Sequence, residues 1–325
     1  MFKIGSKRSR LPVVLALSLA MLLGLQGCAQ NQTSETVIKL GMLPIEDNLP
    51  FYVAEKDQLF QKYGVKVELV EFPSAQEMGS AIQSGQINGE ITDMIVSGLL
   101  KKGGTDIRIA AIASGTTAKE SPFTILASPD SKITKLSDLK NVPIGGTENT
   151  IIHYVLDNML TQAGFNENEI KITSVPKMPV RLEMLLNNQI QAAVFTEPLA
   201  SLGQLQGARK IADDTENNIS QTVILFRQAD IESHAKEVTA VLKAYQEAGQ
   251  AINNTPDQYR ELILEKAKVP DALKSTYKIP TFSKLQLPTE DQISKVMQWM
   301  VSKQLLPQAY SYQDMVNKDL ISDLK

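Results

Sequence analysis

Two stretches of the chain, G-Q-I-N-G-E-I-T-D at residues 85–93 and N-Q-I-Q-A-A-V-F-T-E at residues 188–197, echo one another and decide the fold class. Each predicts the end of a helix, a tight turn and a short buried strand that leads to an acid, Asp93 or Glu197. Before each stretch the chain follows the order strand, loop, helix, strand, helix. The sequence therefore predicts two β-loop-α-β-α-β units.

The two units, residues 41–93 and 145–197, have the same length. In the first, a helix is predicted over Phe51–Tyr63, ending at Gly64. The loops of such units gather at the carboxyl ends of the strands, where open α/β sheets bind ligands. One alternative stays open, a single doubly wound sheet whose halves look alike because βαβ units generally do.

Two apolar stretches, F-T-I-L-A at 123–127 and T-V-I-L-F at 222–226, bracket the second unit. We predict that they are paired crossing strands that form a hinge. The fold class is then α/β, with two lobes, each a βαβ-based sheet flanked by helices. The expected order is a signal segment 1–27, a tether 28–36, a first lobe begun by 37–127, an inserted second lobe 128–220, and a return to the first lobe over 221–325. The return is predicted to contain helices at Ser233–Ala251, Thr255–Lys268 and Thr289–Lys303.

The composition excludes several classes of function. The chain has one Cys and two His, His153 and His234, so neither a disulfide nor a Cys-based or H-E-x-x-H metal site is expected. The 33 Lys and Arg against 36 Asp and Glu include no cationic run in the body, which argues against nucleic-acid binding. No cofactor is predicted.

The N-terminus has the pattern of an export signal. Residues 1–10 carry four cations and no acid, and residues 11–25 are almost wholly apolar but short for a membrane span. The tetrapeptide Leu25-Gln26-Gly27-Cys28 then resembles the lipobox of bacterial lipoproteins, which implies that Cys28 is acylated, with palmitate among the expected chains. Cleavage before Cys28 would leave 29 cations against 36 anions. A single-pass membrane anchor is the alternative.

Four stretches of the body carry a family resemblance. They are V-I-K-L-G-M-L-P from residue 37, P-F-Y-V-A-E-K-D-Q-L-F-Q-K-Y-G-V-K-V-E-L from residue 50, S-D-L-K-N-V-P-I-G-G-T at 137–147 and P-V-R-L-E-M-L-L-N-N-Q-I-Q-A-A-V-F-T-E-P-L-A at 179–200. The chain is similar here to the solute-binding proteins of ABC importers, in the nitrate, taurine, aliphatic-sulfonate and thiamine-precursor binding group (NitT/TauT). The resemblance implies a periplasmic-binding-protein-like type II fold and a monomeric, extracytoplasmic, lipid-anchored receptor that serves a permease and an ATPase.

Candidate ligand-binding residues lie in the loops at the predicted strand ends. Glycines before a helix let backbone N–H groups approach a ligand, and polar side chains at the other strand ends could grip it from both lobes. Capping of neighbouring helices or a plain tight turn is the alternative role for each of them. The predicted ligand-binding residues are Asp47, Asn48, Asp93, Ser114, Gly146, Thr147, Asn149, Thr196 and Glu197.

The charges in these loops favour one class of ligand. The acids are Glu46, Asp47, Asp93, Glu148 and Glu197, and they outnumber the cations, Lys177 and Arg181. A pocket for sulfonate or nitrate would be expected to recruit cations or donors in excess. We therefore expect a neutral or nitrogen-rich small molecule, such as a pyrimidine-like heterocycle.

Two other classes of function stay open from the sequence. Enzymes of the thiamine-precursor and menaquinone pathways resemble this group, but the synthases carry a cysteine-rich motif and this chain has only Cys28. It also has no G-x-S-x-G elbow and no phosphate-binding P-loop. A sensory or scaffolding lipoprotein with the same fold is the other alternative. The expected function is binding, without catalysis.

Overall fold

The computed structural model describes residues 1–2, 36–118, 120, 122–322 and 324. The chain divides into two units, Met1–Thr36 and Val37–Lys325. Cys28 and almost all of the predicted signal segment and tether lie outside the described residues. Among the residues that are described, no helix has the length and apolar character needed to cross a bilayer.

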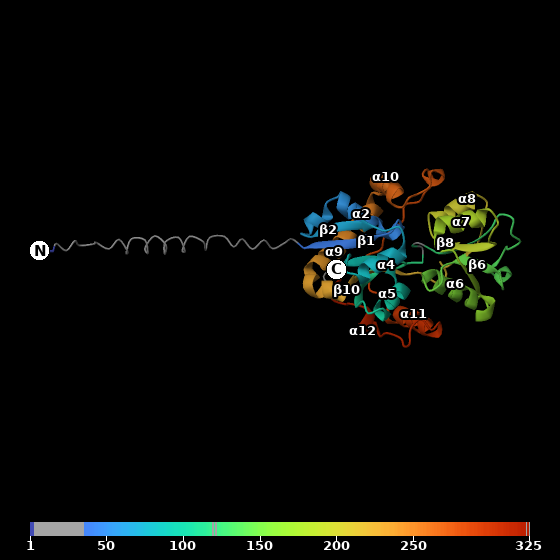
Figure 1. Ribbon diagram of the computed structural model, residues 1–325. Helices are drawn as coiled ribbons and strands as arrows, with labels where there is room; N and C mark the ends of the chain where they lie inside the picture. Colours follow the sequence, from blue (N-terminus) through green and yellow to red (C-terminus); the bar gives the residue numbers. More distant parts are fainter. Residues whose placement is uncertain (3–35, 119, 121, 323, 325) are drawn as a thin grey trace. The chain divides into compact units, whose positions relative to one another are not determined.

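The second unit contains two separate five-stranded sheets (Figure 1). The first has the strand order β2-β1-β3-β10-β4 and the second the order β7-β6-β8-β5-β9, and each sheet with its helices is one lobe. The predicted two-lobed α/β fold is confirmed, and the alternative of one continuous doubly wound sheet is wrong. The strands are β1 Val37–Met42, β2 Lys66–Glu71, β3 Gly89–Asp93, β4 Ile107–Ser114, β5 Thr124–Ala127, β6 Pro143–Gly146, β7 Lys171–Ser174, β8 Ala192–Phe195, β9 Arg209–Asp213 and β10 Thr222–Arg227.

The repeated units form the parallel part of each sheet. β1 pairs in parallel with β2 and β3, and β6 pairs in parallel with β7 and β8. The intervening helices return the chain to the start of the next strand. The helices are α2 Leu49–Lys56, α3 Leu59–Lys62, α4 Ala75–Gln83, α5 Met94–Lys102, α6 Ile151–Gln162, α7 Met178–Leu186, α8 Leu199–Leu205, α9 Gln228–Asn254, α10 Pro256–Lys266, α11 Glu290–Ser302 and α12 Tyr312–Met315, with 3-10 turns at η1 Glu46–Asn48, η2 Leu136–Leu139, η3 Glu167–Glu169 and η4 Asp271–Leu273.

The register corrects one detail of the repeat. Glu90 lies opposite Gly41 in the first sheet, and Ala193 lies opposite Gly145 in the second. The chain between the paired strands is therefore one residue shorter in the second lobe. As a result Asp93 is structurally equivalent to Thr196 and not, as the matching letters suggested, to Glu197.

The crossings between the lobes differ from the prediction. β5 pairs with β8 and β9 in the second sheet, whereas β10 pairs with β3 and β4 in the first, so the predicted pairing of F-T-I-L-A with T-V-I-L-F is wrong. The chain crosses instead through segments 115–123 and 214–221. These segments contact each other: Phe123 N–H donates to Asp214 Oδ1 (2.7 Å), and Gln221 Nε2 donates to Gly115 O (3.4 Å).

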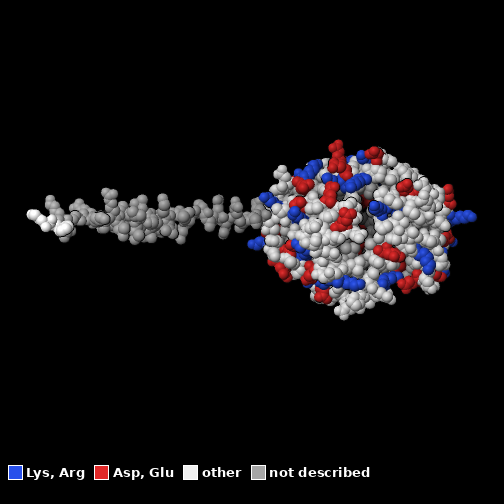
Figure 2. Space-filling view, in the orientation of Figure 1, with Lys and Arg blue, Asp and Glu red and all other residues white. Residues whose placement is uncertain are grey.

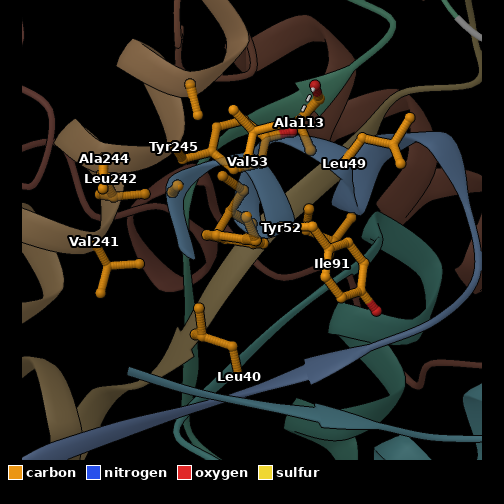
Figure 3. Packing of buried hydrophobic residues seen from close by; sticks show 14 of the residues in the cluster. Leu40, Leu49, Tyr52, Val53, Ile91, Ala113, Val241, Leu242, Ala244 and Tyr245 are labelled. Atoms are coloured by element: carbon orange, nitrogen blue, oxygen red, sulfur yellow. Dashed lines mark hydrogen bonds between the residues drawn. The ribbon is translucent and has the colours of Figure 1, made fainter. Parts of the chain in front are cut away.

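Apolar side chains bury both faces of the first sheet. On one face α2 and α9 pack over β1 and β3, and Leu40, Ile91 and Val53 belong to one buried cluster there (Figure 3). Tyr245 of α9 stacks edge-on against Phe51 of α2, their ring centroids 4.7 Å apart. On the other face α4, α5 and α11 bury residues such as Met78, Ile95 and Met297.

The second sheet is likewise covered on both faces. Residues of α6 pack on the side of Ile144 and Val194, and residues of α7 and α8 pack on the side of Leu126 and Phe195. Because successive side chains of a strand point to opposite faces, α6 and α8 lie on opposite sides of this sheet.

Local signals explain where several helices begin and end. Ser74 caps α4 by accepting from Glu77 N–H, and Thr289 forms a capping box with Gln292 at the start of α11. The single helix predicted over Phe51–Tyr63 is instead two, α2 and α3, because Gln58 adopts a left-handed conformation with φ 57°. A residue at that φ cannot continue an α-helix.

Glu90 of β3 is a buried acid inside the first lobe. Its side chain is 1% exposed, and neither carboxyl oxygen has a hydrogen-bond partner among the described residues. Burial, with a smaller contribution from Asp93, raises the pKa of this carboxyl to about 8. The folded chain therefore holds this proton more tightly than the unfolded chain, whose carboxyl has the ordinary pKa of 4.5. The free energy of unfolding must decrease as pH rises between these two values.

Glu90→Gln should remove this pH dependence, because an amide of the same shape has no proton to lose. At each pH we compare the melting temperature of the variant with that of wild type. We expect this difference, variant minus wild type, to be several degrees larger at about pH 8.5 than at about pH 5. The exposed strand residue Glu68 provides the control, as Glu68→Gln should give no such trend. A constant difference between Glu90→Gln and wild type at both pH values would contradict the assignment.

Candidate functional site

Asp93 connects the two lobes. It is buried at the end of β3 and caps α5, since its Oδ1 accepts from Val96 N–H at 2.8 Å. Its Oδ2 accepts from Ile151 N–H, the first residue of α6 in the second lobe, at 3.4 Å. Burial raises the pKa of Asp93, opposed by these backbone hydrogen bonds. One carboxylate thus caps helices in both lobes. The sequence left open a capping role for Asp93, and in the structure this role includes a helix of the other lobe.

The G-G-T loop lies at the start of α6, in the second lobe. Thr150 Oγ1 donates to Thr147 O (2.7 Å), and Asn149 adopts a left-handed conformation with φ 60° that turns the chain into the helix. Gly146 packs closely, as a Cβ there would lie 3.3 Å from Ile172 Cγ2. The contact of Ile151 with Asp93 places the end of this loop against the first lobe.

Arg181 supports the G-G-T loop through hydrogen bonds of its buried side chain. Its guanidinium is fully buried and donates to Val175 O (2.8 Å), Val194 O (2.8 Å) and Thr147 Oγ1 (2.7 Å). Burial lowers its pKa to about 10, so it stays charged at neutral pH. Because Thr147 Oγ1 accepts from Arg181, the hydroxyl proton of Thr147 must point elsewhere and can serve as a donor.

The predicted residues of the first lobe form a buried group. Asp47 Oδ2 accepts from Thr222 Oγ1 (2.7 Å), and Thr222 is the register partner of Ser114. The Asp47 carbonyl accepts from the buried Tyr245 hydroxyl at 2.7 Å. Asn48 is fully buried and its Nδ2 donates to Leu43 O (2.9 Å). Asp47 and Ser114 thus both lie next to Thr222 of β10, and Asn48 holds the loop after β1.

A cavity of about 320 Å³ lies between the lobes. Glu46 and the segment from Leu273 to Lys278 line it from the first lobe, and Glu197 and Ser201 line it from the second. The predicted ligand-binding residues include Glu197 from this lining but not Glu46, Ser201, Leu273, Thr276, Tyr277 or Lys278. Leu273 is the last residue of η4, and Thr276, Tyr277 and Lys278 follow it in a segment with no helical or strand periodicity, so no sequence pattern placed these four residues at the strand ends.

Negative charge concentrates in this cavity. The Tyr277 hydroxyl donates to Glu46 Oε1. Burial raises the pKa of Tyr277, and the carboxylates Glu46, Glu197 and Asp47 raise it further. Acids from both lobes therefore act on one hydroxyl group, with Lys278 as the cation of the cavity lining. The face of the molecule drawn in Figure 2 shows no such bias, because acidic and basic side chains are interspersed over it.

Thr196 and Glu197 follow β8 and have local partners as well. Glu197 Oε2 accepts from Ser201 N–H at 3.2 Å, and the Glu197-Pro198 peptide bond is cis. Thr196 Oγ1 lies 3.9 Å from Met178 Sδ. Glu197 thus caps the short α8 while its side chain lines the cavity. Ligand contact by the predicted residues stays a prediction.

A smaller cavity of about 220 Å³ lies in the first lobe alone, lined by residues that include Tyr52, Glu71 and Lys266. Lys266 and Glu71 form an ion pair there, 3.4 Å apart. The described residues contain no cluster of His, Cys, Asp and Glu that could hold a metal ion. The cavity between the lobes is therefore the better candidate site, since both lobes build it.

Comparison with known proteins gives a family and a fold for this chain. Residues 46–259 match the family described as NMT1/THI5 like. A protein of Brachyspira hyodysenteriae named as an ABC transporter periplasmic binding protein is 22% identical over 277 residues, covering 79% of this chain and 78% of that protein. The crystal structure of the periplasmic aliphatic sulphonate binding protein SsuA from Escherichia coli has a TM-score of 0.73 at 20% identity, covering 87% of this chain and 92% of that chain.

The same fold also occurs in an enzyme. The crystal structure of the desulfurization enzyme DSZB has a TM-score of 0.63 at 14% identity, covering 89% of this chain and 98% of that chain. The fold alone therefore does not separate a binding protein from an enzyme.

Arg181→Met should destabilise the second lobe. The substitution keeps an unbranched apolar stem but leaves the carbonyls of Val175 and Val194 without their donor, so we expect a loss of about 3 kcal/mol in the free energy of unfolding, measured by urea denaturation. Lys177→Met, at an exposed position just before α7, should change it by less than about 0.5 kcal/mol. Equal stability of the two variants would show that the buried guanidinium does not hold the loop.

Proposed function

Since the chain belongs to the NMT1/THI5-like family, we propose that it is the solute-binding protein of an ABC importer. It captures a small molecule in the cavity between its lobes and delivers it to a membrane permease and its ATPase. The observation that carries this proposal is the cavity itself, which takes Glu46 and Tyr277 from one lobe and Glu197 from the other. A solute that contacts both lobes stabilises the closed form over the open form.

The crossing segments suit such a closure. The chain passes between the lobes twice, after β4 and after β9, and hydrogen bonds from Phe123 to Asp214 and from Gln221 to Gly115 join the described ends of the two crossings. Rotation about two short adjacent segments would open the cavity while leaving both sheets intact. No covalent step is needed for this function, so we propose binding without catalysis.

The charges of the cavity favour a nitrogen-rich solute. Glu46 and Glu197 are hydrogen-bond acceptors from opposite lobes, and the Tyr277 hydroxyl is already engaged as a donor to Glu46. A sulfonate or nitrate there would lie against two carboxylates, with Lys278 as the cation that the described residues contribute to the cavity lining. A heterocycle bearing amino groups, neutral or cationic, can donate to both acids and so draws the lobes together.

A thermal-shift screen of the mature chain tests the ligand class. At about 100 times its dissociation constant, a bound solute adds about 2.7 kcal/mol and should raise the melting temperature by several degrees. We expect aminopyrimidines and related heterocycles to give this shift, and alkanesulfonates and nitrate to give none. A shift with sulfonates alone would overturn the proposed ligand class.

Glu197→Gln should weaken binding of any heterocycle found in that screen. Loss of the charge removes a charge-assisted hydrogen bond, so we expect an increase of about tenfold in the dissociation constant, measured by isothermal titration calorimetry. Glu183→Gln changes an exposed acid of the same lobe on α7 and is the matched control. Identical affinities for the two variants would place the solute away from Glu197.

We also propose that the protein is extracytoplasmic and held at the membrane by acyl chains on Cys28. Support comes from the basic and apolar N-terminal segment that precedes this residue, the only Cys of the chain. One acyl chain binds a membrane only reversibly, so stable anchoring requires more than one chain on this residue.

Cys28→Ser should release the protein from the membrane fraction of cells that export it, because serine in the lipobox is not acylated. Immunoblotting of membrane and soluble fractions measures the change. A mutant that stays in the membrane fraction would indicate that the apolar segment of residues 11–25 is itself the anchor.

A further inference from the structure

A second contact between the lobes lies outside the cavity, between α6 of the second lobe and α11 of the first. Trp299 of α11 packs edge-on against two rings of α6. Its centroid lies 5.0 Å from that of His153 and 5.4 Å from that of Tyr154. Trp299 is the only tryptophan of the chain. Helix α11 belongs to the first lobe because its buried methionines pack on α5, where Met300 Sδ lies 2.9 Å from the position of a Cβ at Gly98.

A buried carboxylate stands at the centre of this contact. Asp157 of α6 is 6% exposed and accepts from Trp299 Nε1 at 2.9 Å and from Lys303 Nζ at 2.6 Å. Lys303 also pairs with Glu167, at 2.6 Å, just beyond α6. Both donors to Asp157 come from the other lobe. Charge-assisted hydrogen bonds to a buried acid are among the stronger polar interactions in proteins.

The contact reaches the G-G-T loop through His153. Its Nδ1 accepts from Asn149 N–H at 3.2 Å, which places the ring proton of the neutral form on Nε2. Nε2 faces Asp157 Oδ1 at 3.6 Å. The loop before α6 is therefore linked to α11 by contiguous contacts through His153 and Asp157.

Apolar packing continues through the same region. One buried cluster includes Leu160 of α6 in the second lobe and Met300 of α11 in the first, and Trp299 packs on it. We name as the clasp the set Trp299 of α11, Lys303 just after α11, and His153, Tyr154 and Asp157 of α6. The clasp lies on the opposite side of the second sheet from α8, whose Ser201 lines the cavity. None of its residues lines the cavity.

We propose that the clasp sets the balance between the closed and open forms of the protein without touching the solute. Its contacts are made entirely by the chain's own residues across the lobes, so they form when the lobes close and break when they open. The inference rests on the proposed function for the assumption that the lobes separate to admit a solute. It adds that affinity for any solute depends on α11 as well as on the cavity, because a more populated closed form requires less of the solute.

The test uses the mature protein with no solute added, so its outcome does not depend on identifying one. Trp299 fluorescence reports on the clasp alone, and acrylamide quenching measures how accessible the indole is. Small-angle X-ray scattering on the same samples measures the radius of gyration. The variants are Asp157→Ala and Lys303→Ala, with Asp157→Asn as a milder change that keeps the side-chain shape. The control is Lys295→Ala, which breaks an exposed ion pair with Asp291 on α11 (2.7 Å).

We expect the clasp variants to shift the closed-to-open ratio by about tenfold, raising the quenching constant of Trp299 and the radius of gyration together. Lys295→Ala should match wild type in both. Far-UV circular dichroism identifies any variant that fails to fold. If Asp157→Ala or Lys303→Ala does not fold, the measurements on Asp157→Asn decide the test. An unchanged radius of gyration in folded clasp variants, with or without a rise in quenching, would overturn the proposal. Failure of every solute in the thermal-shift screen would instead count against the proposed function and leave this result standing.

Discussion

Parallel pairing of the central strands in both lobes decides where the polar groups of this protein lie. Because β1 and β3 run in the same direction, as do β6 and β8, the helices that follow them begin at the same edge of their sheets. Those first turns carry unpaired N–H groups. Asp93 satisfies such groups in α5 and in α6 at once, so the edge of one sheet is joined to the edge of the other. The cavity and the candidate loops then lie along this junction.

The chemistry of the cavity comes from loops of the parallel units and from a segment that follows them in the chain. The fold is shared with a sulphonate-binding protein, yet the side chains here are Glu46, Glu197 and Tyr277. Tyr277 follows η4, far along the chain from the strands. Two lobes of one architecture can thus present different ligand chemistry when the loops and this returning segment change, because the sheets fix only the positions of the strand ends.

The sequence predicts the architecture well because the repeat rests on hydrophobic periodicity, which reflects burial within each unit. It does not predict the partner of β5 or β10, since an apolar run such as F-T-I-L-A indicates a buried strand and not the sheet that buries it. The equivalence of Asp93 and Glu197 was wrong because letters align without regard to the one-residue difference in chain length between the paired strands.

The site was predictable only in part, for a related reason. Asp93 and Glu197 stand next to strands and helix starts, where local patterns are informative, whereas Tyr277 and Lys278 reach the cavity through long-range folding of an aperiodic segment. Asp157 and Trp299 belong to amphipathic helices and read as ordinary surface or core positions, and only the docking of α6 on α11 gives them a role.

The most direct test of the central claim is a crystal structure of the mature chain with a heterocycle that raises its melting temperature. We expect electron density for the solute between the lobes, with its amino groups within hydrogen-bond distance of Glu46 and Glu197. Density in the first-lobe cavity beside Tyr52, or on the surface of one lobe alone, would contradict it.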